Sequence, residues 1–183
     1  GVDLTANNVS PLSGAYDALW TDPGAAANAL GVLSLLPDIP DYIYIEWIVD
    51  FSSLSFGAGD SVDIFTDNTQ TFKISLVENA GNIEIHMAYR DDSGLHSSSV
   101  SIDETIEHKL SYVYQKGDGN GFTTMLIDNA VAISATGLSN TTQDFGTSLT
   151  FGVRNIDATI TGSYQFDNVR YSLIAPGTSE YIE

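Results

Sequence analysis

Residues 162–172, which read GSYQFDNVRYS, decide the fold that we expect for this chain. The apolar side chains of Phe166, Val169 and Tyr171 are separated by three and then two positions, which breaks the period of two of a regular β-strand. An extra residue in a strand forms a β-bulge, so we expect a bulge at Asp167 and Asn168. We predict that this strand closes a fold of two sheets and that its three apolar side chains face the core.

The clearest strand in the sequence is formed by residues 41–51, DYIYIEWIVDF. Strict alternation places one set of apolar side chains on the face that we expect to be core. This set is Ile43, Ile45, Trp47, Val49 and Phe51. The opposite face mixes aromatic rings with carboxylates, since it carries Tyr42, Tyr44, Glu46, Ile48 and Asp50. Such a face is expected to contact water and to be able to hold a ligand.

Short strands recur along the rest of the chain. We predict them at residues 2–9, 62–66, 72–78, 82–90, 94–101, 109–115, 122–129, 131–135 and 149–155. Residues 11–40 are expected to form a long, partly structured loop over a sheet edge, with helix-forming residues near 24–31 for about two turns. Short strands at this spacing, with little helix, predict an all-β, antiparallel two-sheet β-sandwich.

The order of three motifs resembles that in the C-terminal half of laminin G-like and concanavalin A-like domains. The motifs are HKLSYVY at 108–114, LIDN at 126–129 and the closing GSYQFDNVRYS, and the similarity covers about residues 42–172. Ile106 and Glu107 stand where the family usually has a Trp before the His, and Asn129 replaces the commoner Gly. The resemblance implies a jelly-roll sandwich in which His108 has a structural role. The family is too mixed in activity to imply one function.

Length and composition fit one domain. The chain has 183 residues, of which 43% are hydrophobic, and this suffices for one sizeable core. We predict a single domain at residues 1–174 and a tail or linker at 175–183. No apolar run approaches the roughly 18 residues of a membrane span, so membrane insertion is not expected. The absence of cysteine excludes disulfides and thiolate metal sites.

The charge balance argues against nucleic acid as a partner. Asp and Glu number 24 against six Lys and Arg, which gives a net charge of -18. A chain of this charge repels phosphate backbones and anionic lipid surfaces. We expect most of the acidic side chains to form a solvated surface, with divalent-cation sites as the alternative.

Two places in the sequence are candidates for calcium. The turn KGDGNG at 116–121 brings Asp118 and Asn120 together, although a plain hairpin is the favoured alternative there. The second candidate joins Asp167 to Asp3 and N-terminal carbonyls, because sandwich domains similar to this one often tie their ends together with such an ion. The alternative is that Asp167 only caps loop amides. The three histidines lack the spacing of a zinc site.

Carbohydrate recognition needs flat aromatic rings and short polar side chains on one surface. We expect Tyr42, Tyr44 and Glu46 to supply one part of such a surface. Polar positions of two later strands are expected to join it across the sheet, namely Lys73, Glu84, His86 and Arg90. The alternative is that Tyr42 and Tyr44 pack under the loop at 11–40.

No catalytic motif stands out in the sequence. The paired carboxylates of retaining glycosidases, the GxSxG motif of serine hydrolases and a phosphate-binding glycine loop are absent. We therefore expect a non-catalytic carbohydrate-binding or adhesion module for a polysaccharide or glycan, within a larger secreted or cell-surface protein, with calcium as a structural ion. The rival function is a polysaccharide-cleaving glycosidase or lyase that uses Glu84 and His86 as an acid/base pair. A structural spacer domain is the third alternative.

Overall fold

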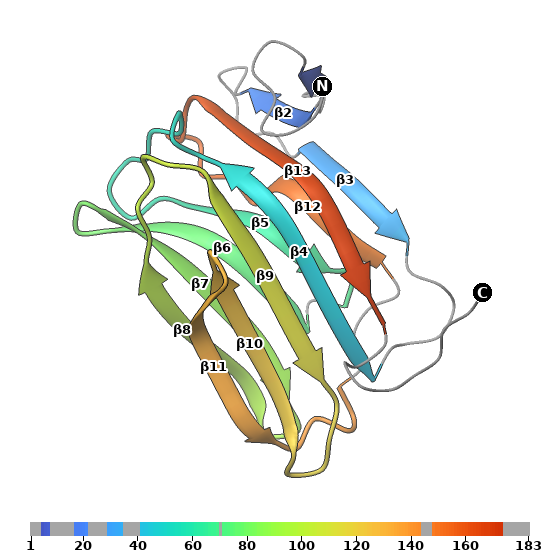
Figure 1. The fold of residues 1–183 in the computed structure, drawn as a ribbon. Coiled ribbons are helices and arrows are strands. Elements are labelled where there is room, and N and C mark those ends of the chain that lie inside the picture. The colour runs from blue at the N-terminus through green and yellow to red at the C-terminus, as the bar shows by residue number, and fades with distance from the viewer. Residues whose placement is uncertain are drawn as a thin grey trace.

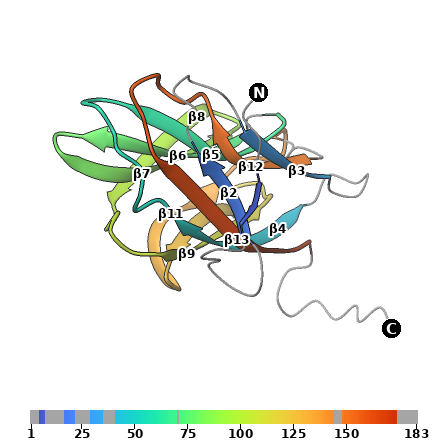
Figure 2. The same ribbon diagram turned by 90° about the horizontal axis from the view of Figure 1, so that it is seen from above.

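The computed structural model describes residues 5–7, 17–21, 29–34, 41–69, 71–143 and 148–173 of the chain. The regular elements in these residues are all β-strands, so they include no helix that could span a membrane. The strands lie in two layers, with β13, β4, β9, β10 and β11 in front and β5 to β8 behind them (Figure 1). The view from above shows the N-terminal strands beside β13 and β12 (Figure 2).

Every neighbouring pair of strands in the two sheets is antiparallel. The seven-stranded sheet has the order β1 (Thr5–Asn7), β2 (Asp17–Thr21), β13 (Ser163–Ser172), β4 (Tyr42–Asp50), β9 (His108–Gln115), β10 (Gly121–Ile127) and β11 (Ala130–Leu138). The six-stranded sheet has the order β3 (Ala29–Ser34), β12 (Ser148–Arg154), β5 (Ser61–Asp67), β6 (Phe72–Asn79), β7 (Asn82–Asp91) and β8 (Gly94–Ser101). The predicted all-β, antiparallel two-sheet sandwich is confirmed.

The core lies between the sheets and is rich in aromatic rings. The five apolar side chains predicted to be core in β4 and just after it are each at most 1% exposed, which confirms that prediction. Trp47 stacks on Phe65 across the core with ring centroids 5.2 Å apart, and Phe72 stacks on Tyr112. Burying a side chain of this size contributes about 2–3 kcal/mol. This aromatic layer holds β4 and β9 against β5 and β6.

The predicted bulge in the closing strand is confirmed. The register of β13 against β4 shifts between Asp167 and Arg170, and Asn168 has a φ of +53°. The Asp167 carboxylate accepts a hydrogen bond from the N–H of Asn168 at 2.6 Å. The shift leaves Phe166 opposite Val49 but brings Arg170 opposite Glu46. The bulge thereby places the guanidinium on the outer face of the sheet.

Tyr171 is not a core residue, so that part of the prediction for the closing strand is wrong. Phe166 is buried and Val169 is half-buried, but Tyr171 is 43% exposed. The reason is the limited length of the neighbouring strand, because β2 pairs with β13 only from Ser163 to Phe166. The C-terminal half of β13 therefore has a described strand on one side only, and Tyr171 contacts solvent at that edge.

The prediction of a loop for residues 11–40 is also wrong in part. This range contains β2, which pairs with β13, and β3, which pairs with β12. The sequences of these two strands, DALWT and ALGVLS, lack a clear alternation of apolar and polar residues, so pairing with a neighbouring strand decides their structure. The expected helical turns near residues 24–31 are wrong for residues 29–31, which belong to β3, and residues 24–28 lie outside the described residues. Within the predicted first strand, residues 5–7 form β1 and the other residues lie outside the described ones, and the strands predicted from residue 62 onward are all present.

Candidate binding faces

The side chains predicted to form one carbohydrate surface lie on two different sheets. Tyr42, Tyr44 and Glu46 belong to β4 in the seven-stranded sheet. The other four predicted residues belong to β6 and β7 in the six-stranded sheet, namely Lys73, Glu84, His86 and Arg90. Both polar faces point away from the core, so the core separates them. The prediction of a single joined surface is therefore wrong. Alternation distinguishes inner from outer positions, but it does not say to which sheet a strand belongs.

The outer face of the seven-stranded sheet centres on Glu46. Its carboxylate accepts a hydrogen bond from the Tyr44 hydroxyl at 2.6 Å and pairs with the Lys109 ammonium at 2.7 Å. The guanidinium of Arg170, which the bulge brings into register, lies 3.8 Å away. We call the outer-facing residues Tyr44, Glu46, Lys109, Phe122 and Arg170 the β4 face.

The hydrogen bonds at Glu46 fix the charge on this face. The bonds from Lys109 and then from Tyr44 lower the pKa of the Glu46 carboxyl. Burial, followed by the bond to Glu46, raises the pKa of the Tyr44 phenol. The bond to Glu46 also raises the pKa of Lys109. At neutral pH the β4 face therefore presents a neutral phenol, a carboxylate and cations. These groups can form hydrogen bonds to a ligand, whereas a neutral Tyr44 cannot act as a base that abstracts a proton.

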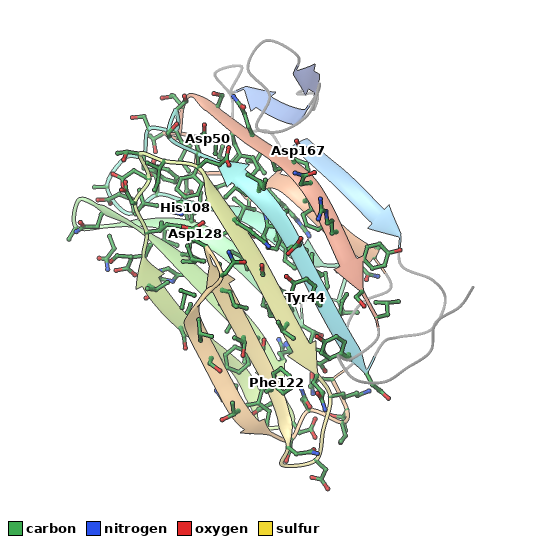
Figure 3. The ribbon with its side chains drawn as sticks, in the orientation of Figure 1. Tyr44, Asp50, His108, Phe122, Asp128 and Asp167 are labelled. Atoms are coloured by element: carbon green, nitrogen blue, oxygen red, sulfur yellow. The ribbon has the colours of Figure 1, made fainter. Side chains whose placement is uncertain are left out.

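A hollow of about 150 Å³ lies beside this cluster. Its lining includes Glu46, Lys109, Asn168 and Arg170, so donors and acceptors surround it. The half-buried Phe122 on β10 faces the same side of the sheet (Figure 3). It pairs with Gln115 on β9, which pairs in turn with Tyr42 on β4, two residues before Tyr44. Phe122 was not among the predicted residues, although the alternation of β10 is a signal that could have found it.

Tyr42 does not offer its ring to a ligand. It is 8% exposed although it faces the outer side of β4, and burial is the main reason that the pKa of its phenol is raised. Tyr42 is therefore covered, and packing of its ring under the loop at 11–40 stays a prediction. Tyr44 is only half-buried, so it is the β4 tyrosine that a ligand can reach.

On the six-stranded sheet, Glu84 and His86 form a pair. The His86 Nε2 lies 3.0 Å from one carboxylate oxygen of Glu84, and the other oxygen accepts a hydrogen bond from the Asn79 amide at 2.9 Å. The bonds from Asn79 and then from Ser99 lower the pKa of Glu84. Neither the hollow at Glu46 nor the one described next is lined by a histidine.

A second hollow, of about 160 Å³, lies at another part of the six-stranded sheet. Its lining includes three cations, Lys73, Arg90 and Arg154, and we call it the arginine hollow. Lys73 and Arg90 were among the predicted residues, and Arg154 was not. The alternation of β12 places Arg154 on the outer face, and a register shift between Phe151 and Arg154 brings it opposite Asp63. The sequence does not show that β12 pairs with β5.

The two predicted calcium sites, at Asp118 with Asn120 and at Asp167 with Asp3, both stay predictions. Asp118 and Asn120 are both exposed, and Asp118 accepts a bond from the Ser139 hydroxyl at 3.4 Å. Backbone carbonyls of the turn would have to complete the six to eight oxygens that calcium takes. Asp3 lies outside the described residues, within which no group of three or more His, Cys, Asp or Glu side chains could hold a metal ion. Calcium at Asp167 stays a prediction.

His108 makes the contacts of a structural residue. Its ring is buried, and its Nδ1 lies 2.7 Å from the carboxylate of Asp128 while its Nε2 lies 2.7 Å from the carbonyl oxygen of Asp103. Phe51 stacks on the ring at 6.1 Å. The pair lies near the start of β9, far from Tyr44 (Figure 3). These contacts agree with the structural role implied by the resemblance.

No family model matches this sequence, and no curated protein matches it. Solved structures do match. An endo-β-1,4-glucuronan lyase from the fungus Trichoderma reesei aligns with a TM-score of 0.67 and 11% identity, over 92% of this chain and 85% of that one. An alginate lyase from Alteromonas sp. 272 aligns with a TM-score of 0.55 and 15% identity, over 93% of each chain.

A toxin domain also matches. The ligand-binding domain of botulinum neurotoxin serotype D, in complex with N-acetylneuraminic acid, aligns with a TM-score of 0.57 and 9% identity. The match covers 93% of this chain but 42% of that one. At such identities the similarities show the fold alone, a jelly-roll sandwich used by polysaccharide lyases and by toxin binding domains. The expected concanavalin A-like sandwich is thus supported as a fold, and laminin G-like character stays a prediction.

Proposed function

We propose that this protein is a non-catalytic carbohydrate-binding module that holds a glycan chain on the β4 face. The observation that carries the proposal is the half-buried Tyr44 ring, which is tied by its hydroxyl to Glu46 beside a hollow lined with polar groups. A tyrosine held in this way loses little additional freedom when a ligand binds, which lowers the entropic cost of association.

The chemistry of the β4 face matches that of a sugar. The apolar C–H face of a sugar ring covers an aromatic ring, and its hydroxyls exchange hydrogen bonds with carboxylates and cations. Tyr44 supplies the aromatic ring and Glu46 supplies the carboxylate. Lys109 and Arg170 supply the cationic donors.

The two aromatic side chains of this face suggest an oligosaccharide. Tyr44 and Phe122 are two strands and two residues apart in the register of β4, β9 and β10. This places their backbones about 10 Å apart across the sheet and about 7 Å along it. Such a separation exceeds one sugar ring, so we infer that two different sugars of one chain contact the two rings.

The names of the structural neighbours are compatible with this function. Two of them are polysaccharide lyases and one is a toxin domain in complex with N-acetylneuraminic acid. A glycan is the ligand class that these proteins have in common, and we propose it for this chain on the strength of the β4 face. We further propose that the module works outside the cell or at its surface, attached to other domains.

The enzyme remains the second candidate because Glu84 and His86 are in contact. Their position makes the enzyme the weaker candidate, because neither residue lines either of the two hollows described above. Active sites usually enclose the reacting groups in a concave pocket. The spacer alternative is less compatible with an aromatic and charged cluster on the β4 face.

The test is a glycan-array assay of the wild-type protein, run once with millimolar calcium and once with a chelator. Tyr44→Ala is compared with Tyr171→Ala, which removes an exposed tyrosine outside the β4 face. We expect Tyr44→Ala to weaken binding about tenfold, which corresponds to about 1.4 kcal/mol, and Tyr171→Ala to have little effect. Loss of binding in chelator only would place calcium in or beside the site.

Absence of binding on a broad array in both buffers would contradict the module and favour the spacer. A lyase assay by ultraviolet absorbance of unsaturated sugar products tests the rival on the same glycans. Product formation that is lost in His86→Ala but kept in His96→Ala would favour the enzyme.

A further inference from the structure

The arginine hollow gathers half of the cationic side chains of the whole protein. The chain has six Lys and Arg against 24 Asp and Glu, and three of the six line this one hollow: Lys73, Arg90 and Arg154. If cations only served to balance nearby acids, they would be dispersed among the many carboxylates. Their concentration at one place on the outer face of the six-stranded sheet is therefore a local feature that the net charge of -18 opposes.

The hollow contains one carboxylate, and that carboxylate is already occupied. Asp63 accepts hydrogen bonds from the Ser75 hydroxyl and the Asn155 amide, each at 2.6 Å, and pairs with the Lys73 ammonium at 3.0 Å. Asp63 is buried, so its hydrogen bonds and ion pair lie at the base of the hollow and orient Lys73 and Asn155. Its charge neutralises one cation, which leaves the hollow with an excess of two positive charges.

Both guanidinium groups remain available to a ligand. Among the described residues, no carboxylate lies within ion-pair distance of Arg90 or Arg154. Arg154 extends from β12 and Arg90 from β7, with β5 and β6 between them, so they reach the hollow from opposite sides. Two arginines that approach one space from two sides can grip a single oxyanion.

The remaining lining is suited to the body of a sugar. Leu95 is 60% exposed and, with Ala88, gives an apolar patch next to the cations. The buried Thr66 hydroxyl in the lining already donates to backbone carbonyl oxygens. A water molecule occupies about 30 Å³. The hollow of about 160 Å³ thus has room for about five waters or for one oxyanion with part of the ring that carries it.

We propose that the arginine hollow is a binding site for the carboxylate or sulfate group of an acidic saccharide, gripped between Arg90 and Arg154. The planar guanidinium fork matches the oxygens of both groups in a bidentate way. A free acidic polymer is repelled at long range by the net charge, so the site acts on a group that is presented close to the sheet. The saccharide part of this inference rests on the proposed function, whereas the oxyanion part does not.

The test is a titration followed by the NMR shifts of backbone amides in β5, β6, β7 and β12. The probes are D-glucuronate, D-glucose 6-sulfate and neutral D-glucose, used with wild-type protein, Arg90→Gln and Arg154→Gln. The matched control is Lys116→Gln, which removes the same charge from a position outside both hollows. Arg154→Lys keeps the positive charge but removes the planar guanidinium group and its two parallel donors.

We expect at least one acidic probe to bind, both arginine-to-glutamine variants to weaken it tenfold or more, and Lys116→Gln to change it less than twofold. Arg154→Lys should lie between wild type and Arg154→Gln, and thermal melts should show that all variants fold. The acidic probe that binds more tightly identifies the group as carboxylate or sulfate.

Binding of neither acidic probe, equal binding of D-glucose, or an equal loss in Lys116→Gln would each overturn the proposal. If a variant did not fold, the other arginine and Arg154→Lys would carry the same comparison. Tyr44→Ala should leave binding of the acidic probe unchanged, so failure of this site and failure of the β4 face are separate results.

Discussion

The Nδ1 of His108 lies 2.7 Å from the carboxylate of Asp128, and this contact joins the start of β9 to the turn between β10 and β11. The same carboxylate accepts the backbone N–H of Lys109 at 2.9 Å. Burial opposes ionisation of Asp128, but the bonds from Lys109 and His108 outweigh it and lower its pKa. The imidazole thus connects β9 to β10 and β11 through this turn, and we call these contacts the His108 corner.

Replacing His108 by Ala should lower the free energy of unfolding by about 2–4 kcal/mol, because a ring that is 4% exposed is lost together with two hydrogen bonds. The measurement is urea unfolding at neutral pH. His96→Ala is the control, since the His96 side chain is 40% exposed and its loss should cost less than about 1 kcal/mol. Equal losses in the two variants would show that the His108 corner contributes nothing special.

Gly162 precedes the closing strand and should not tolerate a side chain. Its φ is +106°, and a Cβ would lie 1.9 Å from the carbonyl oxygen of Ser53. Gly162→Ala should destabilise the protein by at least about 3 kcal/mol, from backbone strain and overlap together. Gly59→Ala is the control, because Gly59 has a φ of +79° but open space around it. It should cost about 1–2 kcal/mol. Similar unfolding midpoints for the two variants would contradict the close approach to Ser53.

Two buried tyrosines should respond differently to the same change. The Tyr112 hydroxyl accepts a hydrogen bond from the buried Thr123 at 2.9 Å, so Tyr112→Phe should cost about 1–2 kcal/mol. The Tyr164 hydroxyl and the Trp47 indole nitrogen are buried without a hydrogen-bond partner among the described residues. Tyr164→Phe should therefore be neutral or stabilising in thermal and urea unfolding. A loss as large as that of Tyr112→Phe would mean that Trp47 donates to Tyr164.

The turn between β7 and β8 should make stability depend on pH in the acid range. Hydrogen bonds from Ser93, and then from His96, lower the pKa of Asp91 to about 2 from an ordinary value of 3.8. A lowered pKa in the folded state means that the ionised carboxylate stabilises the fold above about pH 4. This contribution is lost as the pH falls toward about 2. The solvent-screened contribution is about 1 kcal/mol.

The measurement for this turn is urea unfolding of wild type and Asp91→Asn at pH 7 and at pH 2. The difference in unfolding free energy should be present at pH 7 and mostly lost at pH 2, where about half of the Asp91 carboxyls are protonated in the folded state. Asp157→Asn serves as a matched exposed carboxylate, and a difference that persists unchanged in acid would contradict the role of the Asp91 charge.

The parts of the fold that local pattern controls were predictable. The alternation of β4 identified its core side chains because a strand buried on one face repeats every second residue. The bulge in β13 was predictable for the same reason, since an interruption of that period is visible in Phe166 and Val169. The role of Tyr171 was not, because its exposure depends on how far β2 extends beside β13.

The sequence by itself determined the all-β class, the strand from Tyr42 to Asp50 with its inner and outer faces, and the bulge, because each follows from the order of neighbouring residues. Only the tertiary structure decided which sheet each strand joins. It thereby separated Glu46 from Glu84 on opposite outer faces, and it brought Arg154 to Lys73 and Arg90. The physical reason is that pairing between distant strands depends on contacts that burial of the whole core selects, and no single stretch of sequence contains them.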